Sequence, residues 1–169
     1  MLLISNILSL GSAIAKDTGF ILLGLRLGSS LYVTEKDFTT YEVFTVYGLP
    51  WRWQPFSDWV ITTRWNLEGG LIRSEGDKEL LITSGPGVAI TKNGWPIWID
   101  GGVGLAFLSN DKIGKRDFGA PIQFTAHAGI SYNFGWHLVL GYRFYHMSDA
   151  GFFGGKGVNR QLIELSYHF

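Results

Sequence analysis

The sequence of 169 residues contains no cysteine, so disulfide bonds and thiolate metal sites are excluded. It also has no net charge, because 14 lysines and arginines balance 14 aspartates and glutamates, and this balance gives no sign of a nucleic-acid partner. No apolar run approaches the roughly 20 residues that a membrane-spanning helix needs. A chain of this length fits one domain.

Glycine and aromatic side chains are abundant instead, with 23 Gly, 7 Trp, 7 Tyr and 12 Phe, a composition that suits strands rather than helices. The chain shows about eight alternating apolar runs with turn-like breaks between them, which is the sequence signature of a transmembrane barrel. We expect a kink or bulge at Gly85-Pro86-Gly87 and a tight turn at Asn93-Gly94. The expected strands cover about residues 19–33, 38–53, 58–68, 78–91, 96–109, 122–134, 135–148 and 158–169.

Two architectures can use such strands. A soluble sandwich or lipocalin-like barrel turns its apolar stripes inward, whereas a membrane barrel turns them outward around a polar interior. The faces opposite the stripes combine many glycines with charged side chains that can pair inside a narrow barrel, namely Arg26, Arg64, Asp100, Arg143 and Glu164. Tryptophan and tyrosine lie near strand ends, as in interfacial girdles. The ending at Phe169 resembles the C-terminal strand of bacterial outer-membrane proteins.

We therefore predict an all-β fold, an eight-stranded antiparallel transmembrane β-barrel in a bacterial outer membrane. With eight strands, side chains fill the interior, so the barrel is not expected to be a pore.

The N-terminal residues have the pattern of a secretion signal. Met1 to Leu10 is apolar, and Ala13-Ile14-Ala15 forms a small-residue cleavage pattern before Lys16. The basic residue that normally precedes the apolar core is missing. We expect residues 1–15 to be a signal peptide, whose start is either misassigned or clipped, and residues 16–169 to form a single barrel domain. The alternative is an ordinary apolar N-terminal strand.

A histidine and a serine stand at the end of the seventh expected strand. Because successive side chains point to opposite faces, His146 and Ser148 share the apolar stripe of residues 138–144 and can touch each other. Parity along the last strand places Asn159 on the same outer face near the same rim. Glu164 is the nearest downstream carboxylate, but its parity sends it into the interior unless a bulge reverses it. A base and a hydroxyl at a lipid-facing rim suggest chemistry on a lipid, and ordinary rim residues are the alternative.

The other candidate residues have simpler explanations. His127 and Arg143 have inward parity and are expected to belong to an interior polar network. His137 and His168 are expected near the opposite rim. The charged cluster from Lys112 to Asp117 is expected to be a solvated loop, whose basic residues could touch lipid phosphates.

One segment makes the chain recognisable. The residues Phe144-Tyr145-His146-Met147-Ser148-Asp149-Ala150-Gly151, followed by a glycine-rich turn and Gly157-Val158-Asn159, resemble the PagL family of lipid A 3-O-deacylases. The H-x-S-x-A-G motif is the specific part, and Pro96 to Gly104 is similar to the family's fifth strand. The resemblance implies an eight-stranded outer-membrane barrel with a serine-hydrolase site on its outer wall.

The resemblance also implies a role for each site residue. Ser148 would be the nucleophile, His146 its general base and Asn159 the orienting third member of the triad. The backbone N–H groups of Asp149 and Gly151 would stabilise the oxyanion. The sequence departs from the family pattern at two positions. One is Asp149, where asparagine is usual, and the other is Lys156, in a turn where Pro-Asn is usual.

The implied reaction is hydrolysis of the ester at the 3-position of lipid A, and it needs no metal or cofactor. The implied partner is lipid A in the membrane rather than a nucleic acid, and a homodimer stays open. Two other functions remain as alternatives, a structural or adhesive barrel without chemistry and an acyltransferase acting on lipid A.

Overall fold

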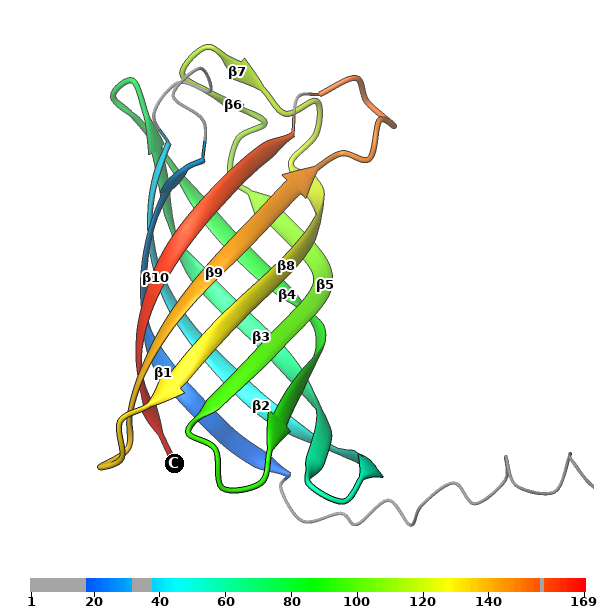
Figure 1. The fold of residues 1–169 in the computed structure, drawn as a ribbon. Helices are drawn as coiled ribbons and strands as arrows, with labels where there is room; N and C mark the ends of the chain where they lie inside the picture. The colour runs from blue at the N-terminus through cyan, green and yellow to red at the C-terminus, as the bar shows by residue number, and fades with distance from the viewer. Residues whose placement is uncertain (1–17, 32–37, 156) are drawn as a thin grey trace, which may run out of the picture.

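The computed structural model describes residues 18–31, 38–155 and 157–169, and all regular structure in them is β (Figure 1). This part of the chain holds no helix long and apolar enough to cross a membrane. The long strands are β1 (Gly19–Ser30), β2 (Thr39–Phe56), β3 (Trp59–Ser74), β4 (Asp77–Lys92), β5 (Ile97–Leu108), β8 (Ile122–Asn133), β9 (Leu138–Ser148) and β10 (Val158–His168). A short hairpin of β6 (Lys112–Ile113) and β7 (Arg116–Asp117) lies between β5 and β8. The expected signal peptide falls outside the described residues and stays a prediction.

The long strands close into a barrel in the order β1-β10-β9-β8-β5-β4-β3-β2, with antiparallel neighbours throughout. Closure leaves no open sheet edge and pairs the backbone groups between strands, as a wall in lipid requires. We call the end that carries β6 and β7 the loop end, and the end where β10 finishes the terminal end (Figure 1). The predicted eight-stranded antiparallel barrel is confirmed.

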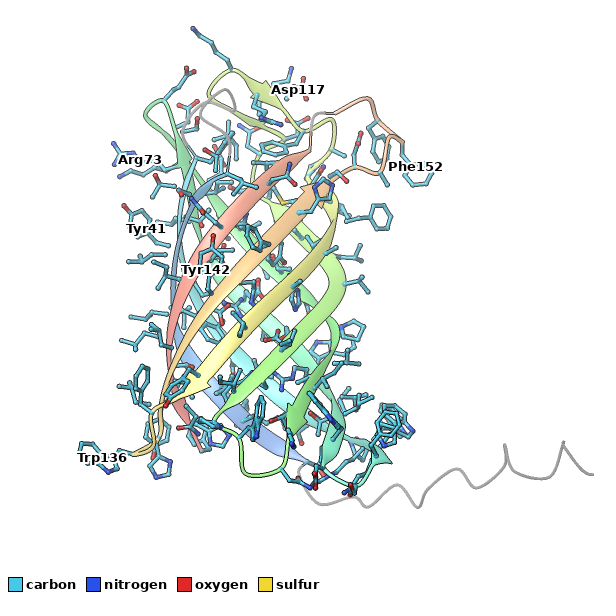
Figure 2. The ribbon with its side chains drawn as sticks, in the orientation of Figure 1. Tyr41, Arg73, Asp117, Trp136, Tyr142 and Phe152 are labelled. Carbon is cyan, nitrogen blue, oxygen red and sulfur yellow. The ribbon has the colours of Figure 1, made fainter. Side chains whose placement is uncertain are left out.

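The outward side chains are mostly large and apolar. Along β9 the residues at 138, 140, 142 and 144 are exposed, and those between them are buried. Most of the exposed tryptophans lie in or near the turns of the terminal end, where Figure 2 shows Trp136; the others there are Trp51, Trp53, Trp59 and Trp95. An apolar wall with an aromatic girdle is typical of a barrel that faces lipid. The stripes therefore do not turn inward as a lipocalin-like barrel would require.

Charged side chains in mutual contact fill the middle of the interior. The carboxylate of Glu164 accepts a hydrogen bond from Arg143 Nε at 2.5 Å and forms an ion pair with Arg26, whose Nε lies 2.6 Å away. The remaining pairs are Arg26–Glu68, Arg143–Asp100 and Arg160–Glu42. Pairing is necessary here, because an isolated charge in a low-dielectric interior is strongly destabilising.

An apolar cluster closes the interior at the loop end. Met147 of β9 and Val158 of β10 are fully buried in it, together with Ile113 and Phe118 from the loop that holds β6 and β7. Its other members are Phe38, Ile72, Leu81, Ala106 and Leu108. Since Met147 and Val158 alternate with outward-facing residues, the cluster fixes the ends of β9 and β10 from the inside.

Among the strand boundaries that differ from the expected ones, two have a clear structural reason. The third strand does not end at Gly69-Gly70 but continues to Ser74. Gly70 allows close packing of β3 on β2, because a Cβ at this position would clash with the carbonyl oxygen of Tyr41. Residues 135–137 form the turn before β9 and not its first residues. Trp136 and His137 adopt positive φ angles of 49° and 68°, which a strand does not allow.

The kink or bulge predicted at Gly85-Pro86-Gly87 is not found there, and a register shift occurs at another place in the barrel. β4 is unbroken through Gly85-Pro86-Gly87, and its register with β5 is the same on both sides of this segment. A register shift occurs instead near Ile21 of β1, which turns this side chain inward against the buried Leu22, Phe44, Val46 and Val139 at the terminal end. Regular alternation would place Ile21 on the same outward face as Leu23 and Leu25, and the register shift is the reason that it does not lie there.

The loop of residues 110–119 combines solvated charge with a buried side. Lys112 and Asp117 form an exposed ion pair at 3.3 Å, as a solvated loop would allow. Ile113 lies between them in sequence and is fully buried. The charged face is therefore one side of a hairpin that also covers the barrel.

We expect Glu164→Gln to lower the free energy of unfolding by about 3–5 kcal/mol, because two buried guanidinium groups lose their shared carboxylate. Urea unfolding in detergent micelles, followed by tryptophan fluorescence, measures the change. Asp117→Asn removes a carboxylate from an exposed pair and is the matched control, expected to have little effect. Equal stability of Glu164→Gln and the unsubstituted protein would contradict a stabilising network.

Candidate active site

The loop-end termini of β9 and β10 bring three of the predicted site residues together on the outer wall. His146 and Ser148 lie on the outward face of β9, with buried Met147 between them. Asn159 of β10 is the cross-strand partner of His146. The two strands run side by side to this end of the barrel (Figure 1).

Hydrogen bonds join these three side chains into one chain. His146 Nδ1 lies 2.8 Å from Asn159 Oδ1, and His146 Nε2 lies 3.2 Å from Ser148 Oγ. With Nδ1–H donating to the amide oxygen, Nε2 keeps its lone pair and accepts from the serine hydroxyl. A hydroxyl, a base and an orienting group in this order can perform nucleophilic catalysis.

The remaining candidates lie away from this chain. Glu164 faces the interior and pairs with Arg26 and Arg143, so it does not reach His146. His127 is also inside the barrel, stacked on the ring of Tyr145. His137 and His168 lie at the terminal end, as expected.

Asp149 organises the loop that follows Ser148. Its carboxylate accepts hydrogen bonds from the backbone N–H groups of Gly151 at 2.8 Å, Phe153 at 2.9 Å and Gly155 at 2.8 Å. The N–H groups of Gly151 and Gly155 contribute most to holding the pKa of Asp149 below its usual range. The predicted oxyanion role of Gly151 needs correction, because its N–H is directed at this carboxylate instead.

Ala150 supplies a backbone donor that the sequence analysis did not identify. Its N–H lies 3.4 Å from Ser148 Oγ. Ala150 adopts a positive φ of 54°, an uncommon conformation for a residue with a Cβ. Alanine carries no sequence signal for this conformation, so the donor could only be found in the structure.

Gly157 packs directly against the hydrogen-bonded chain. A Cβ at this position would lie 2.9 Å from Ser148 Cβ and 3.3 Å from His146 Cε1. Arg116 of β7 donates a hydrogen bond to the carbonyl oxygen of Gly157, which ties the loop above the barrel to the start of β10. Lys156 lies outside the described residues, and its role in the turn stays a prediction.

The surface around the site is apolar. Phe124 of β8 is the cross-strand partner of Ser148, and its ring lies 6.0 Å from that of Phe152 in the following loop. Figure 2 shows Phe152 at the loop end of the barrel, where 73% of it is exposed. Within the described ranges, no group of three His, Asp or Glu side chains could hold a metal ion.

Residues 39–168 match the family described as lipid A 3-O-deacylase (PagL). The chain belongs to the PagL family. The matched range contains the whole segment from Phe144 to Asn159, so the resemblance noted in the sequence is confirmed. Membership assigns the chain to the carboxylic ester hydrolases that act on lipid A.

Solved structures support the fold of this PagL family member. It is similar to the crystal structure of the outer membrane enzyme PagL, with a TM-score of 0.76 and 19% identity over 88% of this chain and 99% of the other. It is also similar to a de novo designed transmembrane β-barrel, with a TM-score of 0.63 and 13% identity over 92% and 100%. The attachment invasion locus protein Ail of Yersinia pestis gives a TM-score of 0.50 and 13% identity over 91% and 99%. A comparison with curated protein sequences finds no match.

We expect Gly157→Ala to reduce lipid A deacylation about tenfold to a hundredfold, because the added methyl group displaces Ser148 and His146 by a few tenths of an ångström or more. The measurement is the rate of fatty-acid release from lipid A in detergent micelles. Gly69→Ala is the matched control, since a Cβ there meets nothing within 4 Å. An unchanged rate in Gly157→Ala would contradict the tight packing of the site.

Proposed function

We propose that this PagL family member is a serine esterase that removes the 3-O-linked acyl chain of lipid A. The protein is an outer-membrane barrel whose family acts on lipid A. The observation that carries the finer proposal is the hydrogen-bonded chain from Ser148 through His146 to Asn159 on the lipid-facing wall. This geometry supports nucleophilic attack by serine with histidine as the base.

In the first half of the reaction, Ser148 Oγ attacks the ester carbonyl carbon while His146 Nε2 takes the hydroxyl proton. The tetrahedral intermediate collapses, the C–O bond to the sugar breaks, and His146 returns the proton to the leaving sugar oxygen. The products are a lipid A hydroxyl group and an acyl ester on Ser148. In the second half, His146 activates a water molecule that releases the fatty acid and restores the serine.

Asn159 acts as a positioning residue in this proposal. Its oxygen accepts from Nδ1–H, which fixes the imidazole tautomer and leaves Nε2 free to take the proton. A neutral amide does not stabilise the imidazolium as a carboxylate does. We therefore infer that orientation, and not charge, is what Asn159 supplies.

The oxyanion needs donors directed at the developing negative charge. The backbone N–H groups of Asp149 and Ala150 follow the nucleophile directly, and that of Ala150 already lies near Ser148 Oγ. A donor of this kind is worth about 3–4 kcal/mol in comparable sites. The Asp149 carboxylate is held in the loop by its own three donors, and Asp149 would contribute only its N–H to the oxyanion.

The position of the site suits a lipid substrate. His146 and Ser148 continue the apolar stripe formed by Leu138, Leu140, Tyr142 and Phe144. A substrate on this wall keeps its acyl chains in the membrane while its sugar ester lies at the rim. The ester therefore reaches the serine without leaving the bilayer.

We predict that Gram-negative cells expressing the protein contain lipid A that has lost one 3-hydroxyacyl chain, and that Ser148→Ala abolishes this loss. Mass spectrometry of extracted lipid A measures both results. Removing the nucleophile is expected to lower the rate by at least about a thousandfold.

Ser57→Ala serves as the matched control, because Ser57 is an exposed serine in the β2–β3 turn at the opposite end of the barrel. Continued deacylation by folded Ser148→Ala protein would refute the serine mechanism. Unchanged lipid A with the unsubstituted protein folded in the membrane would instead favour a structural barrel, and an added chain would indicate an acyltransferase.

A further inference from the structure

A cavity of about 430 Å³ lies inside the barrel at the terminal end, far from Ser148. Residues of β1, β2, β3, β4, β5 and β10 line it, together with Phe169. The ionisable side chains among the lining residues are Arg52, Arg64 and His168, with no aspartate or glutamate. The described wall of this cavity is therefore electropositive.

Arg64 differs from the other buried arginines of the described interior. Arg26, Arg143 and Arg160 each form a direct ion pair with a carboxylate. Arg64 is only 6% exposed, yet its guanidinium makes no ion pair or hydrogen bond to another described residue, and its buried Nε has no partner. A buried cation without a contacting anion is strongly destabilising.

The cross-strand partners of Arg64 are glycines, Gly48 on β2 and Gly87 on β4. The space beside Gly87 is filled, because a Cβ there would lie 2.8 Å from the carbonyl oxygen of Gly101 and 2.9 Å from Asn66 Nδ2. A ligand therefore reaches Arg64 from the cavity that this side chain lines, where its guanidinium is the donor without a partner.

We infer that this cavity binds a small oxyanion, a phosphate or a carboxylate, through Arg64. A guanidinium presents its donors in a planar fork that matches either oxyanion, and charge-assisted hydrogen bonds of this kind are strong. His168 borders the same space and adds a second donor when its ring nitrogen carries a proton. The site is independent of lipid A hydrolysis at the opposite end of the barrel.

Isothermal titration calorimetry on the full chain folded in detergent micelles tests this inference. Inorganic phosphate and acetate are titrated separately at constant ionic strength, which distinguishes the two oxyanions. We expect saturable binding of at least one, and a loss of about tenfold or more in affinity in Arg64→Gln.

Arg73→Gln is the matched control, because Arg73 is an exposed arginine at the loop end (Figure 2). It should bind the oxyanion like the unsubstituted protein. Circular dichroism and lipid A deacylation confirm that Arg64→Gln is folded, since neither depends on the cavity. The absence of saturable binding to the unsubstituted protein, or equal affinity in folded Arg64→Gln, would overturn the inference.

Discussion

The alternation of side chains along strands of a closed wall is the constraint on which this structure depends. In lipid, every strand must pair its backbone on both sides, so the barrel has no edge along which a strand can slip freely. Each side chain then faces either the lipid or the interior. On β9, His146 and Ser148 face outward and Met147 faces inward. A slip of one residue would bury His146 and Ser148 and expose the arginines to lipid.

Contacts inside the barrel stabilise this arrangement of inward and outward side chains. Its middle is a set of paired charges, and its loop end is an apolar cluster that includes Met147 and Val158. These two side chains anchor the strands that carry His146 and Asn159 on the other side of the wall. The loop above adds a second layer, in which Arg116 holds the Gly157 carbonyl and Asp149 holds three backbone N–H groups. The geometry of the proposed site thus depends on contacts that lie outside the site itself.

The alternation of inward and outward side chains could be predicted from the sequence. This alternation was enough to predict the barrel and the place of the candidate site on its outer wall. His146, Ser148 and Asn159 share an outward phase on two strands joined by a short loop, which is enough to bring them together. The direction of individual N–H groups could not be read in this way. Gly151 was expected to face the oxyanion, but the neighbouring Asp149 carboxylate competes for its N–H and binds it.

The structural role of glycine was the hardest to predict, because a glycine can end a strand or allow close packing within it, depending on its neighbours in space. Gly69-Gly70 suggested a break but continues a strand, since Gly70 packs closely against the backbone of β2. Nothing in the apolar sequence around Ile21 indicates the register shift that occurs there. The cavity beside Arg64 depends on six strands meeting at one end, and no local pattern encodes it.

The most direct measurement is to identify the residue that reacts covalently with a fluorophosphonate carrying a long alkyl chain. A nucleophilic serine displaces fluoride from phosphorus and retains the phosphonyl group, which peptide mass spectrometry locates. We predict modification of Ser148, with loss of the reaction in His146→Ala. Modification of a different residue, or continued lipid A deacylation after Ser148 is fully modified, would contradict a serine esterase on the outer wall.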